Sequence, residues 1–140
     1  MICSSSHLSL EMPVSYFVNH EKKRIYSRAT GTVTYIDLRE HMLSEFGKPT
    51  AGYAELFDTT GAESDINADD IKALVKERSQ IARVQEAAPV AIVAPSDSFF
   101  ELFGMFNDLT SEIRPIGVFR ASAEAEEWLD RLPAVASSPG

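Results

Sequence analysis

The chain has 140 residues, of which 24% are charged and 44% hydrophobic, as in ordinary globular proteins. This length predicts one domain that hides about 70% of the surface of its unfolded chain, so its core needs no metal or disulfide. Thirteen Lys and Arg against 21 Asp and Glu give a formal net charge of −8. That charge repels a nucleic-acid backbone, so nucleic acid is not expected as a partner.

The two ends of the sequence differ from the segment between them. Residues 1–12 form a Ser-rich stretch without the pattern of a secretory signal, and we expect a disordered leader there. Residues 133–140 are small and flanked by Pro, which predicts a flexible tail. The domain should therefore span 13–132. Because no apolar run is long enough for a membrane and Cys3 is the single cysteine, we expect a cytoplasmic protein without a membrane partner.

The first part of the domain predicts a hairpin followed by a helix. Residues 14–19 and 24–33 are rich in β-branched and aromatic side chains and flank a short charged turn, which is typical of two antiparallel strands. Thr34 and Asp37 have the spacing of an N-cap pair. An apolar stripe with helical spacing follows this pair and ends at Gly47, so a helix is expected between Thr34 and Gly47.

The next segment predicts a strand and a second helix. Residues 53–58 indicate the strand, and the polar residues 59–65 indicate a loop. Asn67 is a good N-cap for the helix that follows, and Asp69 and Asp70 suit the positive end of its dipole.

The last third of the domain predicts two more strand–helix units. Residues 89–94 are apolar without alternation, as in a central strand covered on both faces, and they lead into a helix over about 99–111. Residues 114–120 form a strand that Pro115 marks as an edge, and Ser122 is expected to cap a last helix. The order ββαβαβαβα predicts an α/β fold with a mixed five-stranded sheet, in which parallel pairs follow an N-terminal antiparallel hairpin.

This order of elements, with several short segments, carries a resemblance to a known fold. The segments are 57–58 at the end of the third strand, 66–71 at the start of the second helix, 91–97, 118–120 and 123–129. Together they resemble the STAS domains of sporulation anti-sigma-factor antagonists, and they are similar to small bacterial SpoIIAA-like proteins of unassigned function. The similar segments are structural rather than catalytic, so the resemblance implies a SpoIIAA-like fold and says little about activity.

The resemblance also implies a possible phosphorylation site. In the antagonists, a Ser at the start of the second helix is phosphorylated by the partner kinase, and the added charge breaks the complex. With a one-residue gap in the loop, the Asp-Ser-Ser-Gly run of the family falls on Asn67, Ala68, Asp69 and Asp70. The acceptor position then carries Ala or Asp, so the phosphorylatable Ser switch is not expected in this chain.

No set of residues indicates an enzyme. His7, His20 and His41 are far apart in the sequence and match no metal or nucleophile motif. Asp37 and His41 are four residues apart on one helix, which favours a surface hydrogen bond over an acid–base pair. The acidic residues within 58–70 lack the spacing of a calcium loop. We therefore expect no catalytic residues, no metal and no cofactor; a hydrolase or transferase is the least favoured alternative.

The predicted third helix carries more apolar side chains than packing on a sheet requires. One stripe of the helix is already apolar along its whole length, and Phe100 and Met105 lie outside it. If they point outward, they contribute to an exposed apolar patch, which soluble monomers tend to restrict to binding sites. If another segment covers them, they belong to the core.

Two classes of function are compatible with these features. The favoured one is a non-catalytic regulatory or protein-interaction module of the STAS type, which binds another protein or itself. Its contact residues would be Asn67, Asp69 and Asp70 at the second helix, and Phe100 and Met105 on the third. The alternative is a domain that binds a small apolar or anionic ligand between a helix and the sheet. An exposed patch favours the first class, and a cavity favours the second.

Overall fold

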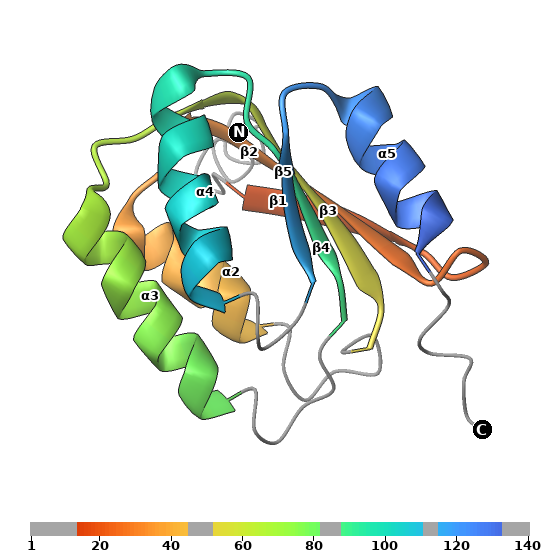
Figure 1. Ribbon diagram of the computed structural model, residues 1–140, viewed down its shortest axis with the longest axis horizontal. Helices are drawn as coiled ribbons and strands as arrows, with labels where there is room; N and C mark the ends of the chain where they lie inside the picture. Colours follow the sequence, from red (N-terminus) through yellow and green to blue (C-terminus); the bar gives the residue numbers. More distant parts are fainter. Residues whose placement is uncertain (1–13, 45–51, 82–87, 111–114, 133–140) are drawn as a thin grey trace, which may run out of the picture.

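A mixed sheet with helices on both faces forms the domain (Figure 1). The computed structural model describes residues 14–44, 52–81, 88–110 and 115–132, so the predicted leader and tail lie outside the described residues. The elements in chain order are β1 (Val14–Asn19), β2 (Arg24–Thr32), α2 (Tyr35–Ser44), β3 (Ala54–Glu63), α3 (Ala68–Ile81), β4 (Val90–Val93), α4 (Asp97–Thr110), β5 (Ile116–Phe119) and α5 (Ser122–Arg131). The predicted order ββαβαβαβα is confirmed.

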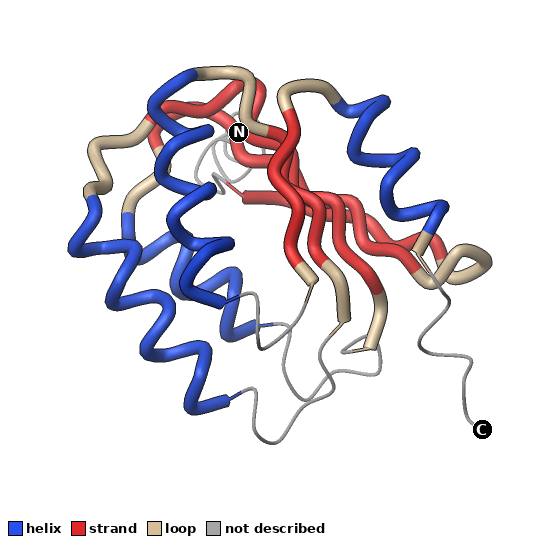
Figure 2. The backbone as a smooth tube through the Cα atoms, viewed as in Figure 1, coloured by secondary structure: helices blue, strands red, loops and turns tan. Residues whose placement is uncertain are grey.

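The strands follow one another in space as they do in the sequence. The sheet order is β1-β2-β3-β4-β5, with β1 antiparallel to β2 and every later pair parallel. Successive right-handed crossovers in one direction place their helices on the same face, which explains why α2, α3 and α4 lie together. The helix α5 follows the last strand and covers the opposite face (Figure 2). The predicted mixed sheet with an N-terminal hairpin is confirmed.

Two helices begin with the side-chain caps that the sequence predicts. At α2, the Asp37 backbone N–H donates to Thr34 Oγ1 at 3.2 Å and the Thr34 N–H donates to Asp37 Oδ2 at 2.9 Å. At α3, the Asp70 N–H donates to Asn67 Oδ1 at 3.0 Å and the Asn67 N–H donates to Asp70 Oδ2 at 3.1 Å. Each pair satisfies backbone donors that the first helical turn leaves unpaired.

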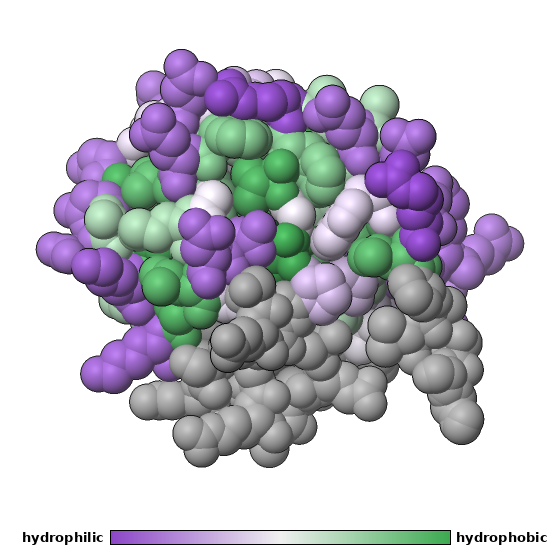
Figure 3. All heavy atoms as spheres, in the orientation of Figure 1, coloured by the Kyte–Doolittle hydropathy of each residue, from purple (hydrophilic) through white to green (hydrophobic). Residues whose placement is uncertain are grey.

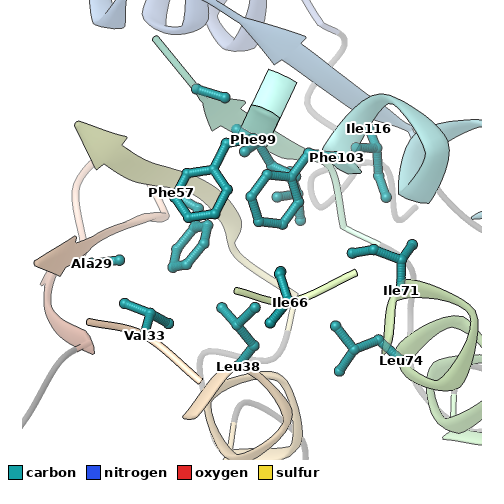
Figure 4. Close-up of a cluster of buried hydrophobic side chains, with 13 residues drawn as sticks. Ala29, Val33, Leu38, Phe57, Ile66, Ile71, Leu74, Phe99, Phe103 and Ile116 are labelled. Atoms are coloured by element: carbon teal, nitrogen blue, oxygen red, sulfur yellow. The ribbon is translucent and has the colours of Figure 1, made fainter. Parts of the chain in front are cut away.

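The main core lies between the sheet and the helices α2, α3 and α4. Figure 4 shows side chains from these layers pointing toward one another, among them Leu38 of α2, Phe57 of β3 and Phe103 of α4. A second cluster lies under α5 and consists of Leu56, Ala91, Val93, Ala125 and Leu129. All four residues of β4 are buried, as expected of a central strand covered on both faces.

The structure corrects two local predictions. The loop expected at 59–65 is strand as far as Glu63, because β3 continues to pair with the end of β2 beyond a register shift between Arg28 and Thr30. Ser122 does not cap α5: it lies inside the first turn, while the extended residue Ala121 occupies the N-cap position without a side-chain hydrogen bond.

An arginine on β2 holds α5 against the sheet. The Arg24 guanidinium donates to Glu126 at 2.7 Å and to Asp130 at 3.1 Å, and only 8% of its side chain is exposed. Burial alone would lower the pKa of Arg24, but its interactions with Tyr26 and Asp130 outweigh burial and raise that pKa above its ordinary value. The N-terminal hairpin is thus tied to the last helix.

Candidate functional site

A small cavity lies on the helical face of the sheet. Its volume is about 80 Å³. Ten residues line it, and eight of them are hydrophobic: Leu38, Met42, Phe57, Leu74, Val90, Ile92, Phe103 and Phe106. The other two are His41 and Glu55. The cavity therefore has an apolar wall with a single polar region.

The polar region is a hydrogen-bonded set of three side chains from three elements. Ser27 of β2 donates its hydroxyl to Glu55 Oε2 at 2.6 Å. His41 of α2 places its Nε2 at 2.7 Å from the same oxygen, and its ring stacks on Phe57 with 5.4 Å between ring centroids. The side chains of His41 and Glu55 are only 12% and 11% exposed. We call Ser27, His41 and Glu55 the polar triplet.

The local sequence places each member of the triplet on the inner face. On β2, Ile25 and Ser27 are buried while Arg28 is exposed, because alternate side chains of a strand point to opposite faces. On β3 the same alternation puts Glu55 on the face of Phe57, toward the helices. His41 follows Leu38 by three residues, so both lie on the inward side of α2.

The sequence-based interpretation missed this set. The surface hydrogen bond predicted between Asp37 and His41 is wrong, because Asp37 caps the start of α2 and His41 turns inward to Glu55. One signal was available: period-two alternation in β3 places a Glu on the same face as Phe57, and a buried carboxyl group requires hydrogen-bond partners. Nothing in the local pattern identifies His41 as that partner.

The geometry of the triplet differs from that of a nucleophilic triad. In a triad, the His lies between the Ser and the acid, so that it can take the hydroxyl proton. Here Glu55 lies in the middle: its Oε2 accepts from Ser27 and also lies 2.7 Å from His41 Nε2. The arrangement can hold a carboxyl group in a fixed orientation beside the cavity, and it leaves no imidazole next to the hydroxyl.

A larger hollow of about 440 Å³ lies on the opposite face, between the first three strands and the N-terminal half of α5. Its charged groups have both signs: Arg28 is positive, and Asp58 and Glu126 are negative. Glu126 already accepts hydrogen bonds from Arg24 and Tyr26. We place the candidate site at the smaller cavity because its polar groups are buried and converge.

The residues predicted as partner contacts occupy two separate helices. At the start of α3, Asn67 and Asp70 use their side chains in the helix cap, and Asp69 is exposed. On α4, Phe100 and Met105 are half-buried and pack against the main core. In the part of the chain that the structure describes, no hydrogen bond or ring contact joins the two groups. Their role as partner contacts stays a prediction.

Although Phe100 and Met105 are half-buried, α4 and β5 still carry exposed apolar surface. Figure 3 shows hydrophobic residues gathered over these elements, with hydrophilic residues around them. Leu109 of α4 is 48% exposed, and the Arg120 guanidinium covers the ring of Phe100 at 4.1 Å from its centroid. Among the residues that the structure describes, the other large hydrophobic side chains with high exposure are Tyr16, Phe17 and Ile36, on β1 and α2.

The described residues contain neither a metal-binding cluster nor a membrane-spanning helix. No group of three or more His, Cys, Asp and Glu side chains there is arranged to hold a metal ion. None of the helices in those same ranges has both the length and the apolar character needed to cross a membrane.

Comparison with known proteins bears on the fold. No protein-family model matches the sequence, and no curated protein is significantly similar to it. A solved structure from Shewanella loihica PV-4 does match: an uncharacterized protein from the DUF3478 family, described as having a SpoIIAA-like fold. The match has 19% identity and a TM-score of 0.55, and it covers 83% of this chain and 93% of that chain. The fold is SpoIIAA-like.

The SpoIIAA-like fold agrees with the resemblance drawn from the sequence, including the mixed five-stranded sheet. At 19% identity, the comparison concerns the fold alone. The function of the chain must therefore be argued from its cavity and its surface.

Proposed function

We propose that this SpoIIAA-like domain is a non-catalytic binding domain that holds a small, largely apolar ligand between the sheet and the helices α2, α3 and α4. The cavity with His41 and Glu55 at its otherwise apolar wall is the observation that carries the proposal. Ligand sites are typically apolar with a few converging polar groups, and this cavity has that composition. The ligand-binding alternative from the sequence is therefore preferred over the interaction role.

The energetics of the core support this proposal. The hollow of about 80 Å³ leaves part of its apolar wall without packing partners, so that wall forgoes dispersion contacts. A buried carboxyl group beside an imidazole adds little stability compared with well-packed apolar residues. A ligand that fills the cavity and uses the polar region would recover part of the stability that both features cost.

The order of the triplet supports a binding role without chemistry. A nucleophilic Ser needs a base that accepts its proton, and the group next to Ser27 is a carboxyl whose Oε2 also lies 2.7 Å from His41 Nε2. No member of the triplet is placed as an imidazole base beside a hydroxyl. We therefore propose that the domain binds its ligand and does not transform it.

The proposal is tested by titrating the full chain with toluene as a small apolar probe. Chemical-shift changes are measured by methyl and amide NMR. We expect saturable shifts at residues around the cavity, such as Leu74 and Val90, and none in the cluster under α5 at Ala125. Shifts confined to the surface, or no shifts at all, would argue against a ligand cavity.

A second candidate function is the protein-interaction module without the Ser switch. It is favoured by the apolar surface over α4 and β5, where Leu109 is 48% exposed one turn after the half-buried Met105. The resemblance places the phosphorylated Ser at Ala68 or Asp69, both of which are exposed, and neither side chain can be phosphorylated as a Ser is.

Native mass spectrometry separates this candidate from the first. If α4 and β5 form a contact between two copies, wild type is a dimer and Leu109→Ser is a monomer. Phe17→Ser is the matched control, because Phe17 is 63% exposed on β1 at the other edge of the sheet. If the wild type stays monomeric at high concentration, self-association is rejected. If only Phe17→Ser loses the dimer, the contact between the two copies lies at β1 rather than at α4 and β5.

A further inference from the structure

The two edges of the sheet differ in how well they are protected from pairing with another strand. Among the strands that the structure describes, β1 and β5 lie at the edges. β5 has only four residues, and a very short edge strand is one of the ways in which proteins prevent a sheet from extending. β1 has six residues, pairs with β2 without a register shift, and contains neither a charged residue nor a Pro. It therefore lacks the usual protection of an edge strand.

Exposed hydrophobic side chains gather at this edge. Within the described residues, four large hydrophobic side chains are highly exposed, and three of them are Tyr16 at 48%, Phe17 at 63% and Ile36 at 52%. Tyr16 and Phe17 are neighbours on β1, so they lie on opposite faces of the sheet, and Ile36 belongs to α2, which contacts β1. The Phe17 ring stacks on Tyr26 of β2 with 5.1 Å between centroids. Such a concentration is typical of an interaction surface.

We infer that β1 pairs in antiparallel fashion with β1 of a second copy of the chain, so that two five-stranded sheets join into one. This inference goes beyond the proposed ligand binding and does not rest on it. An edge strand presents backbone N–H and C=O groups along its outer side, and an added strand satisfies them. Val, Tyr and Phe make up four of the six residues of β1, and these residue types favour strands.

The sequence of β1 suits pairing with itself. In an antiparallel pair related by a two-fold axis, each face of one sheet continues into the same face of the other, so either Tyr16 meets Tyr16 or Phe17 meets Phe17 near the axis. Aromatic cross-strand pairs are favourable, whereas like charges directly opposite each other are destabilising, and β1 has none. The contact is the same on both copies, so assembly stops at the dimer.

The charges beside β1 favour a second copy as its partner. In the exposed turn that follows β1, Lys22 and Lys23 outnumber the single acid. At the other end of β1, β2 continues into α2, where Asp37 and Glu40 outnumber the single arginine, which is already paired with Glu77. Antiparallel pairing brings the basic turn of each copy toward the acidic end of the other. This attraction opposes the repulsion between two chains of net charge −8.

Sedimentation equilibrium of the full chain tests the inference. We expect a dimer at about 100 μM and a dissociation constant raised at least about tenfold by Phe17→Lys, because a lysine on an edge strand opposes pairing. Leu109→Lys is the matched control: it places the same charge at an exposed hydrophobic position on α4 and should leave the dimer intact. A monomeric wild type, assembly beyond the dimer, or loss of the dimer in Leu109→Lys alone would overturn the inference.

Disulfide formation tests the strand pairing itself. Opposite residues of an antiparallel pair have Cα atoms about 4.5–5.5 Å apart, which suits a disulfide. With Cys3 replaced by Ser, a single Cys at position 16 or 17 should therefore link two chains under mild oxidation, in one of the two variants. Leu109→Cys in the same background should stay unlinked. Linkage at 109 with none at 16 or 17 would contradict a β1 contact.

A charge substitution provides a readout that leaves β1 unchanged, in case Phe17→Lys fails to fold. Lys22→Glu places an acid in the turn that approaches the acidic end of the other copy, and we expect it to weaken the dimer several-fold. Lys72→Glu on α3 is the control, because Lys72 is also exposed and its replacement changes the net charge equally. Equal weakening by both would overturn the antiparallel arrangement, since only net charge would then oppose association.

Discussion

His41 and Glu55 are 14 positions apart in the sequence, and their side chains meet in a 2.7 Å contact beside a cavity. A helix residue and a strand residue thus form a polar pair within an apolar layer. Breaking one side of such a pair leaves a buried polar group with one partner fewer, which costs more than replacing both sides.

Substitution of the pair should show strong coupling. We expect His41→Leu and Glu55→Leu each to lower the free energy of unfolding by about 2–4 kcal/mol, and the double variant to lose less than the sum by at least about 1 kcal/mol. Urea unfolding of the four proteins measures the coupling. His20→Leu is the control, because His20 is exposed and its side chain lies 3.0 Å from the Tyr53 hydroxyl rather than in the core. Additive losses would show that the pair does not act as a unit.

The same Val→Leu substitution should affect stability and ligand binding differently at positions 90 and 93 of β4. Val90 faces the cavity and Val93 faces the cluster under α5. Val90→Leu should leave stability nearly unchanged and weaken toluene binding, because the added methylene occupies empty space. Val93→Leu should destabilise by about 1–3 kcal/mol through overpacking and leave binding unchanged. Thermal unfolding and NMR titration measure both; equal destabilisation at the two sites would mean that Val90 has no free space beside it.

The cap of α3 should contribute measurably to stability. Asn67→Ala removes the acceptor for the Asp70 backbone N–H and should cost about 1 kcal/mol in chemical denaturation. Asp69→Asn is the matched control, since it keeps a polar residue in the same turn and alters only the interaction with the helix dipole, worth a few tenths of a kcal/mol. A larger loss for Asp69→Asn than for Asn67→Ala would contradict the assigned roles.

The ion pairs of Arg24 should matter more than those on the surface. Arg24→Met removes two hydrogen bonds to α5 from a side chain that is 8% exposed, and we expect a loss of about 1–3 kcal/mol in unfolding free energy. Arg131→Met is the control, because its contact with Glu127 is 3.9 Å long and both side chains are about two-thirds exposed. Hydrogen exchange in α5 should rise in the first variant only. Unchanged exchange there would show that Arg24 does not hold the helix.

Features that depend on residues close together in the sequence were predicted correctly. Strand and helix periodicity, the caps at Thr34 and Asn67, and the fully apolar strand β4 rest on neighbouring residues, and all are confirmed. The end of β3 was not predictable in this way, because Thr59 to Glu63 become strand by pairing with β2 after a register shift. Pairing between distant segments overrides the polar, loop-like composition of these residues.

The candidate site escaped prediction for the same physical reason. Ser27, His41 and Glu55 belong to three elements that become neighbours only when the sheet and α2 pack together. Helical spacing related His41 to Asp37, the acid one turn earlier on the same helix, whereas in the fold His41 contacts a buried acid from β3. The half-burial of Phe100 likewise depends on Arg120, a residue from beyond β5.

The link between Arg24 and α5 also shapes how the chain folds. Arg24 and Asp130 are separated by 106 residues, so the entropy of closing this loop is large until the intervening strands have paired. Once β3, β4 and β5 are in place, the two ends of the domain are already near each other and the contact forms at little further cost. The N-terminal hairpin and the last helix therefore complete the domain together, and each derives its stability from the other.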